Sequence, residues 1–146
     1  MEFELNSEAG GEWMFGKFCY WANNEMLGYY DIGTSLRDVL FQIQYVIKCC
    51  GNRYFTDCSI SATELFNYMN KCIYGDGGAY DECKLVEVPA RFEITFPIDI
   101  FDCGVKAFLF DCLHDSSRII YSIGNGAIKE LKVGRGEFDS AIIKFY

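Results

Sequence analysis

The chain has 146 residues, a net charge of −8 and 51% hydrophobic residues. This composition excludes a disordered protein, and the length predicts a single domain over residues 1–146 with a substantial core. Because negative charge repels a phosphate backbone, we expect no nucleic-acid partner. The acidic start lacks the basic region of a secretory signal, and no apolar run approaches the ~20 residues of a membrane span. We therefore expect a cytoplasmic protein with no membrane partner.

Strands are predicted first along the chain. Residues 1–5 form a short strand, and residues 13–21 crowd five aromatic side chains into a segment rich in strand formers. Asn23 and Asn24 then predict a tight turn that tolerates positive φ, and residues 25–30 return as the second strand of a hairpin.

Two helices follow the hairpin. From Leu36 to Cys50 the apolar residues recur at spacings of three and four, Ser35 can cap the first turn, and Gly51 supplies the stop. A second helix begins after the capping box Ser61-Ala62-Thr63-Glu64 and ends at Gly75. The segment 75–87 is predicted to be an irregular loop.

A period of two replaces the helical period after this loop. Alternating residues predict a strand at 91–96, and short turns separate four further strands, at 105–112, 118–123, 127–133 and 137–145. Short connections imply antiparallel neighbours. The predicted fold class is therefore α+β: a mostly antiparallel sheet with two helices packed on one face, in the order β-β-β-α-α followed by a β meander.

Four stretches of the chain carry a family resemblance. They are W-M-F-G-K-F-C-Y-W at 13–21, Y-Y-D-I-G-T-S-L-R-D-V-L at 29–40, F-P-I-D-I-F-D at 96–102 and G-R-G-E-F-D-S-A-I-I at 134–143. Together they resemble the immunity protein 42 family of bacterial polymorphic-toxin systems. The resemblance is closest over 13–51, looser from 92 onward, and absent from 1–12 and 75–87.

The resemblance implies a cytoplasmic antidote of the kind used in contact-dependent growth inhibition, which binds and neutralises a cognate toxin domain. It brings no catalytic motif and no cofactor, so we expect a protein that is not an enzyme.

Eight cysteines and one histidine could suggest other chemistry. No C-x-x-C pair occurs, so the spacing disfavours a metal site and we expect none. Apolar neighbours predict that most cysteines are buried free thiols in a reducing cytosol, with Cys49 and Cys83 more exposed. An alternative hypothesis is a cysteine-dependent hydrolase or redox enzyme, in which a cysteine folds next to His114.

The distribution of acidic residues along the chain indicates what kind of partner it binds. Residues 1–12 carry four acids and no base, and residues 75–87 carry four acids and one lysine, so two segments hold −7 of the net −8. A nuclease toxin is basic around its substrate groove, and a concentrated acidic surface would speed its capture. We therefore expect the partner to be a basic C-terminal toxin domain with nuclease activity, whose active site this chain occludes.

Within these segments Tyr80 lies among acids, as an interface anchor does, although it could equally fold back onto the core. The candidate toxin-binding residues are Asp76, Tyr80, Asp81, Glu82, Glu8, Glu12, Asp99 and Asp102. The competing interpretations are that the acids only solvate the surface, or that the chain is an adaptor for another basic protein.

Overall fold

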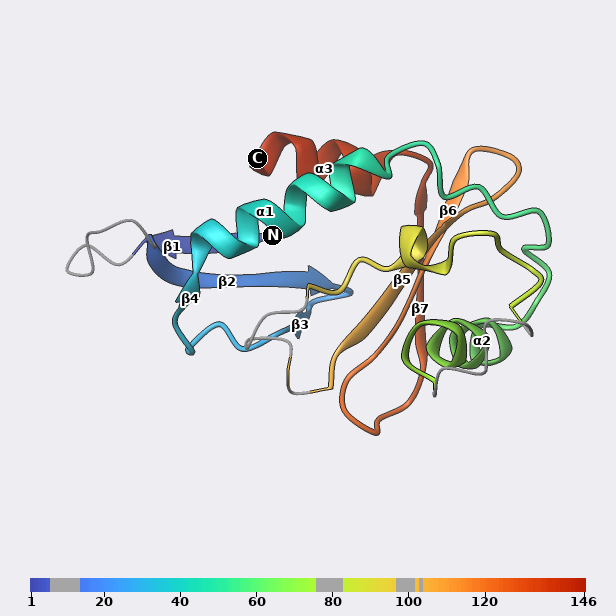
Figure 1. The fold of residues 1–146 in the computed structure, drawn as a ribbon, viewed down its shortest axis with the longest axis horizontal. Coiled ribbons are helices and arrows are strands. Elements are labelled where there is room, and N and C mark those ends of the chain that lie inside the picture. The colour runs from blue at the N-terminus through green and yellow to red at the C-terminus, as the bar shows by residue number, and fades with distance from the viewer. Residues whose placement is uncertain (6–13, 76–82, 97–101, 103) are drawn as a thin grey trace.

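The computed structural model describes residues 1–5, 14–75, 83–96, 102 and 104–146 (Figure 1). Its elements, in chain order, are β1 (Glu2–Leu5), β2 (Phe15–Ala22), β3 (Glu25–Leu27), β4 (Thr34–Ser35), α1 (Leu36–Lys48), α2 (Ala62–Tyr74), the 3₁₀ helix η2 (Pro89–Phe92), β5 (Lys106–Asp111), β6 (Ser116–Ser122), β7 (Lys129–Gly134) and α3 (Glu137–Phe145). The predicted α+β class is confirmed. As predicted, the first strands are followed by two helices and then by an antiparallel meander, but the meander is shorter than predicted and a third helix, α3, follows it.

The first sheet is built around β2. This strand pairs antiparallel with β1 along one edge and with β3 and β4 along the other. The predicted hairpin between β2 and β3 is confirmed, because Asn23 and Asn24 take φ values of 50° and 61° and Ala22 pairs with Glu25. The returning strand is shorter than predicted and ends at Leu27.

The second sheet is the antiparallel meander β5-β6-β7. One face joins the larger core with β2, α1 and α3, and the other face packs on α2. Figure 1 shows α2 on one side of this sheet and α1, α3 and the first sheet on the other. The two predicted helices therefore do not share one face of one sheet. The chain forms two sheets because β2 and β5 do not pair.

Both predicted helices are confirmed. The Ser35 hydroxyl accepts a hydrogen bond from the Asp38 amide at the start of α1, and Ile43 in the middle of the apolar stripe is fully buried. The capping box of Ser61 and Glu64 opens α2 with both of its reciprocal hydrogen bonds. Capping and period, which are local properties, were sufficient to place these helices.

The strand predicted at 137–145 is wrong, since this segment is helix α3. Phe138, Ile142 and Phe145 recur at spacings of four and three, which places them on one helical face, and all three pack on the larger core. At the start of the helix Gly136 takes a φ of 75°, and the Glu137 carboxylate accepts a hydrogen bond from the Gly134 amide at 2.9 Å.

The strand predicted at 91–96 is also wrong. Pro89 opens the 3₁₀ helix η2 instead, where its fixed φ and missing N–H suit the first helical position. Among the described residues, an isolated bridge between Glu93 and Phe108 and a hydrogen bond from the Ile94 amide to the Ala107 carbonyl oxygen join this segment to β5. The alternating apolar residues Phe92, Ile94 and Phe96 are nevertheless buried.

Four cysteines depart from the prediction of free thiols. Cys58 bonds to Cys112 and Cys72 to Cys83, across separations of 54 and 11 residues. The prediction of free, buried thiols is confirmed at Cys19. The prediction that Cys49 is exposed is wrong. This free cysteine is the C-cap residue of α1 and is only 8% exposed. Cys103 lies outside the described residues.

A buried ion pair joins distant parts of the chain. Arg53 is 0% exposed, and its Nη1 donates to Asp139 Oδ1 at 2.7 Å. Its Nη2 donates to the Val46 carbonyl oxygen at the end of α1, and its Nε to the Arg91 carbonyl oxygen in η2. The second Asp139 oxygen accepts a hydrogen bond from the Gly51 amide. One guanidinium therefore holds α1, η2 and α3 together.

Asp139→Asn tests this junction. The change keeps the side-chain volume but leaves a buried guanidinium without its charge partner, so we expect the free energy of unfolding to fall by about 3–5 kcal/mol. Glu4→Gln is the matched control, because it removes the exposed Lys17–Glu4 pair, which contributes about 1 kcal/mol or less. Urea denaturation measures both changes. Equal effects would mean that Arg53 is not the junction.

Candidate functional site

The structure places one of the eight sequence-predicted residues. Asp102 is described and exposed. The other seven lie outside the described residues: Asp76, Tyr80, Asp81, Glu82, Glu8, Glu12 and Asp99. Their neighbours in the chain therefore have to locate the candidate surfaces.

The neighbours of two candidate segments meet at one cavity. Tyr74 ends α2 immediately before Gly75, and Phe96 and Asp102 border the second segment. These three residues line a cavity of about 350 Å³ together with Glu93, Thr95, Gly104, Val105 and Lys106. The disulfide between Cys72 and Cys83 also returns the chain to the last turn of α2. We name this site the α2–β5 cavity.

The polar groups of the α2–β5 cavity form a connected set. The Lys106 ammonium donates to Asn70 Oδ1 at 2.5 Å and lies 4.3 Å from the centroid of the Tyr74 ring, a cation–π distance. The Tyr74 hydroxyl donates to Glu93 Oε1. Burial raises the pKa of Glu93 to about 7, although the charge of Lys106 opposes that rise. The charge of this cavity therefore changes near neutral pH.

Sequence reasoning missed Tyr74, Glu93 and Lys106. Tyr74 ends α2, Glu93 lies in the segment predicted as a strand, and Lys106 begins β5. No sequence motif connects the three residues. Only the packing of α2 against β5 brings them together. A weak signal was present, because Glu93 is the one acid in the apolar run R-F-E-I-T-F.

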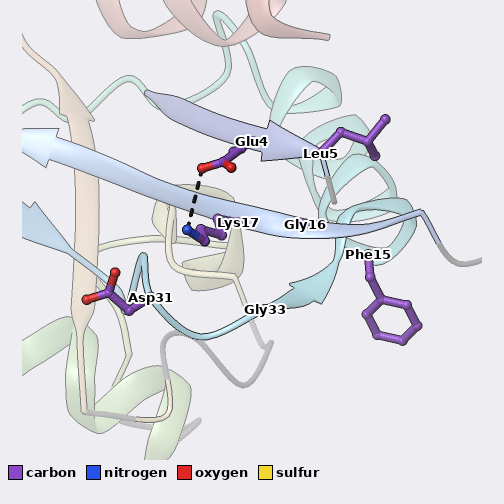
Figure 2. Close-up of a pocket in the computed structure, with 7 residues that line it drawn as sticks. All are labelled: Glu4, Leu5, Phe15, Gly16, Lys17, Asp31 and Gly33. Atoms are coloured by element: carbon purple, nitrogen blue, oxygen red, sulfur yellow. Dashed lines mark ion pairs between the residues drawn. The ribbon is translucent and has the colours of Figure 1, made fainter. Parts of the chain in front are cut away.

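A second polar hollow lies on the first sheet. It measures about 380 Å³ and is lined by residues of β1, β2 and the segment before β4: Glu4, Leu5, Phe15, Gly16, Lys17, Asp31 and Gly33. Figure 2 shows the side chains of Glu4 and Lys17 turned toward each other from adjacent strands, with their charged atoms 3.5 Å apart. Lys17 also lies 5.6 Å from the Tyr30 ring. The described residues that border the segment with Glu8 and Glu12 are Leu5 and Met14, at this end of the sheet.

A third cavity, of about 340 Å³, bears on the enzyme alternative. Cys58, Cys112 and His114 are among its lining residues, so a histidine and two sulfur atoms do share one hollow. The two sulfur atoms are bonded to each other, however, and neither is a free nucleophile in this state. Arg118, which the sequence did not single out, fixes this region by donating to the carbonyl oxygens of Cys58 and Ile60.

The described part of the chain has neither a metal-binding cluster nor a membrane-spanning helix. No group of three His, Cys, Asp or Glu side chains among the described residues is placed to hold a metal ion. No helix within the same residues is both long and apolar enough to cross a membrane.

Comparison with known proteins identifies one family. A family model described as immunity protein 42 matches residues 1–146. The match therefore also covers 1–12 and 75–87, where we expected no resemblance from the sequence. No curated protein and no solved structure matches the chain.

The raised pKa of Glu93 predicts how the stability of the fold depends on pH. Its folded pKa of about 7 is above the ordinary value of 4.5, so the folded state holds this proton more tightly than the unfolded chain. The resulting stability is complete at acid pH and is lost as the pH rises through 7. We expect the unfolding free energy of Glu93→Gln to fall less than that of the native chain between about pH 5 and pH 8. Glu87→Gln, at an exposed position, is the control and should follow the native profile.

Proposed function

Because the chain belongs to the immunity protein 42 family, we propose that it binds a cognate toxin domain one to one and covers that toxin's active site. Membership of the family assigns the role of an immunity protein, and the match over residues 1–146 is the observation that carries the proposal. Protection then depends on occupancy of the toxin and involves no turnover.

We further propose that the toxin is a basic nuclease captured in the cytoplasm by the acidic segments. The net charge of −8 is concentrated at 1–12 and 75–87, and a basic partner is drawn to such segments before contact. The surroundings of the α2–β5 cavity suit a basic partner as well. Tyr74 is 45% exposed there, and the exposed Asp102 offers a carboxylate at the same cavity. An exposed aromatic ring among charges is a common anchor of protein interfaces.

Co-purification tests the function itself. The toxin is expected to be the C-terminal domain of a large secreted protein encoded by the adjacent gene. This domain should elute with the immunity protein as a 1:1 complex, and its activity should be lost in that complex. The toxin domain of an unrelated system is the control and should elute alone. If the adjacent domain also elutes alone and stays active, the proposal fails.

Charge reversal tests the capture of the toxin. Changing Asp76, Asp81 and Glu82 together to Lys should slow association and flatten its dependence on ionic strength, because rim charges act mainly on encounter. Tyr80→Ala should act mostly on dissociation if this ring is an anchor. Biosensor kinetics at two salt concentrations measure both rates. Unchanged rates in the triple variant would exclude this segment as the capture surface.

His114→Ala separates the binding role from the enzyme alternative. A protein that acts by occlusion needs no histidine beside its sulfur atoms, so the variant should protect cells from the toxin as well as the native chain does. Circular dichroism establishes that the variant is folded. Loss of protection by a folded variant would favour a cysteine-dependent enzyme, because the third cavity places Cys58 and Cys112 near this ring.

A further inference from the structure

Strand β1 is the outermost strand of the first sheet. It ends the order β1-β2-β3, and among the described elements it pairs with β2 alone. All four of its residues are exposed. The opposite edge of β2 is already occupied by β3 and β4.

The backbone of β1 offers hydrogen-bonding groups at its outer edge. A Cβ atom on Gly16 of β2 would lie only 2.3 Å from the Glu4 carbonyl oxygen, which shows that this oxygen faces β2. Successive residues of an antiparallel strand turn their N–H and C=O groups to opposite sides. The N–H and C=O groups of Phe3 therefore point away from β2, where another strand can pair with them.

The side chains of β1 divide between two faces. Phe3 and Leu5 lie on one face and are 56% and 54% exposed. Glu2 and Glu4 lie on the other face, where Glu2 accepts a hydrogen bond from Trp21 Nε1 at 2.8 Å. A strand added at this edge would meet apolar groups on one face and carboxylates on the other.

This edge lacks the lysine and proline that commonly prevent pairing. Proteins protect exposed edges with short strands, charged side chains (above all lysine), proline or bulges. Strand β1 is short and carries two glutamates, which oppose an acidic partner strand but not a basic one. Strand β7, at an edge of the second sheet, carries Lys129 and Lys132. The sequence of β1 is E-F-E-L, with no base and no proline.

We propose that the edge of β1 pairs with a strand of the toxin in which apolar and basic residues alternate. The apolar side chains pack on Phe3 and Leu5, and the basic ones face Glu2 and Glu4, so that the first sheet continues into the partner. The inference rests on the proposed function, because the partner is the same toxin domain. The acidic segments then govern the rate of encounter, and the edge holds the toxin after it has arrived.

A second copy of this chain is a poorer occupant of the edge. When two β1 strands pair antiparallel about a twofold axis, Glu2 lies opposite Glu4 of the other copy, and like charges directly opposite each other are destabilising. A shift by one residue removes this clash but sets glutamates against Phe3 and Leu5. A basic strand meets neither obstacle.

Phe3→Pro tests the edge directly. Proline removes the outward N–H group and is tolerated at the outer side of an edge strand. Phe3→Ala is the matched control, because it also loses the ring contact with Phe145 but keeps the N–H group. In biosensor experiments with the toxin domain of the adjacent gene, we expect Phe3→Pro to dissociate about tenfold faster than Phe3→Ala.

The outcomes separate the two proposals. If the native chain binds the toxin and the two variants dissociate at equal rates, the edge inference is overturned and the proposed function stands. If the native chain does not bind the toxin, the proposed function fails and the edge inference fails with it.

Amide hydrogen exchange gives a second readout that needs no substitution. The outward Phe3 amide should exchange at least about tenfold more slowly in the complex, because it gains a partner across the interface. The Glu4 amide, which faces β2, should change less. Equal exchange at Phe3 in the free and bound protein would overturn the inference. A chain that dimerises without toxin and protects the same amide would overturn it also, in favour of a second copy.

Discussion

The buried contact of Arg53 with Asp139 is the constraint on which the arrangement of helices depends. A guanidinium removed from water is tolerated only when its charge and its donors are all satisfied, and here the three groups that satisfy them come from α1, η2 and α3. The end of the chain must therefore dock before this centre is complete. Once docked, α3 places Phe145 against Phe18 of β2 and closes the larger core.

This closure determines which surfaces remain for a partner. The second sheet is covered on both faces, by α2 on one and by the larger core on the other, so its side chains serve packing. Among the described residues, α1 and α3 pack on one face of the first sheet, and its outer strand β1 pairs with β2 alone. The two proposed binding surfaces that the structure describes, β1 and the α2–β5 cavity, lie at borders of the fold. Such borders are where a partner can be accommodated without altering the core.

Local rules predicted much of the fold, and tertiary contacts account for the remainder. Ser35 and Ser61 marked both helix starts because a cap is a property of a few adjacent residues. The prediction for residues 137–145 was wrong because I-I-K-F-Y is rich in residues that favour strands. The contact of Asp139 with Arg53, 86 residues away in the chain, favours the helix instead. The prediction of a strand at 91–96 was also wrong. The alternation of apolar residues correctly indicated which side chains are buried, but Pro89 favours a 3₁₀ helix at the start of this segment. The disulfide partners were beyond reach, because sequence spacing does not determine pairing.

The candidate site was less predictable than the fold. Seven of its eight residues stay predictions, and Asp102 became informative only when the structure placed it beside Glu93 and Tyr74. The raised pKa of Glu93 comes from burial, and the only local sign of it was the position of this acid between the apolar residues Phe92 and Ile94.

The two disulfides give the chain a connectivity that its linear order does not. Cys58 joins the segment before α2 to the end of β5, and Cys72 joins α2 itself to the segment after residue 82. For every peptide bond between Cys72 and Cys83, both disulfides therefore connect the chain before that bond to the chain after it. A protease that cut the acidic segment once would leave both fragments covalently joined, and they would separate only after reduction. The segment that carries four of the eight candidate contacts can thus be cut without separating the two halves of the molecule.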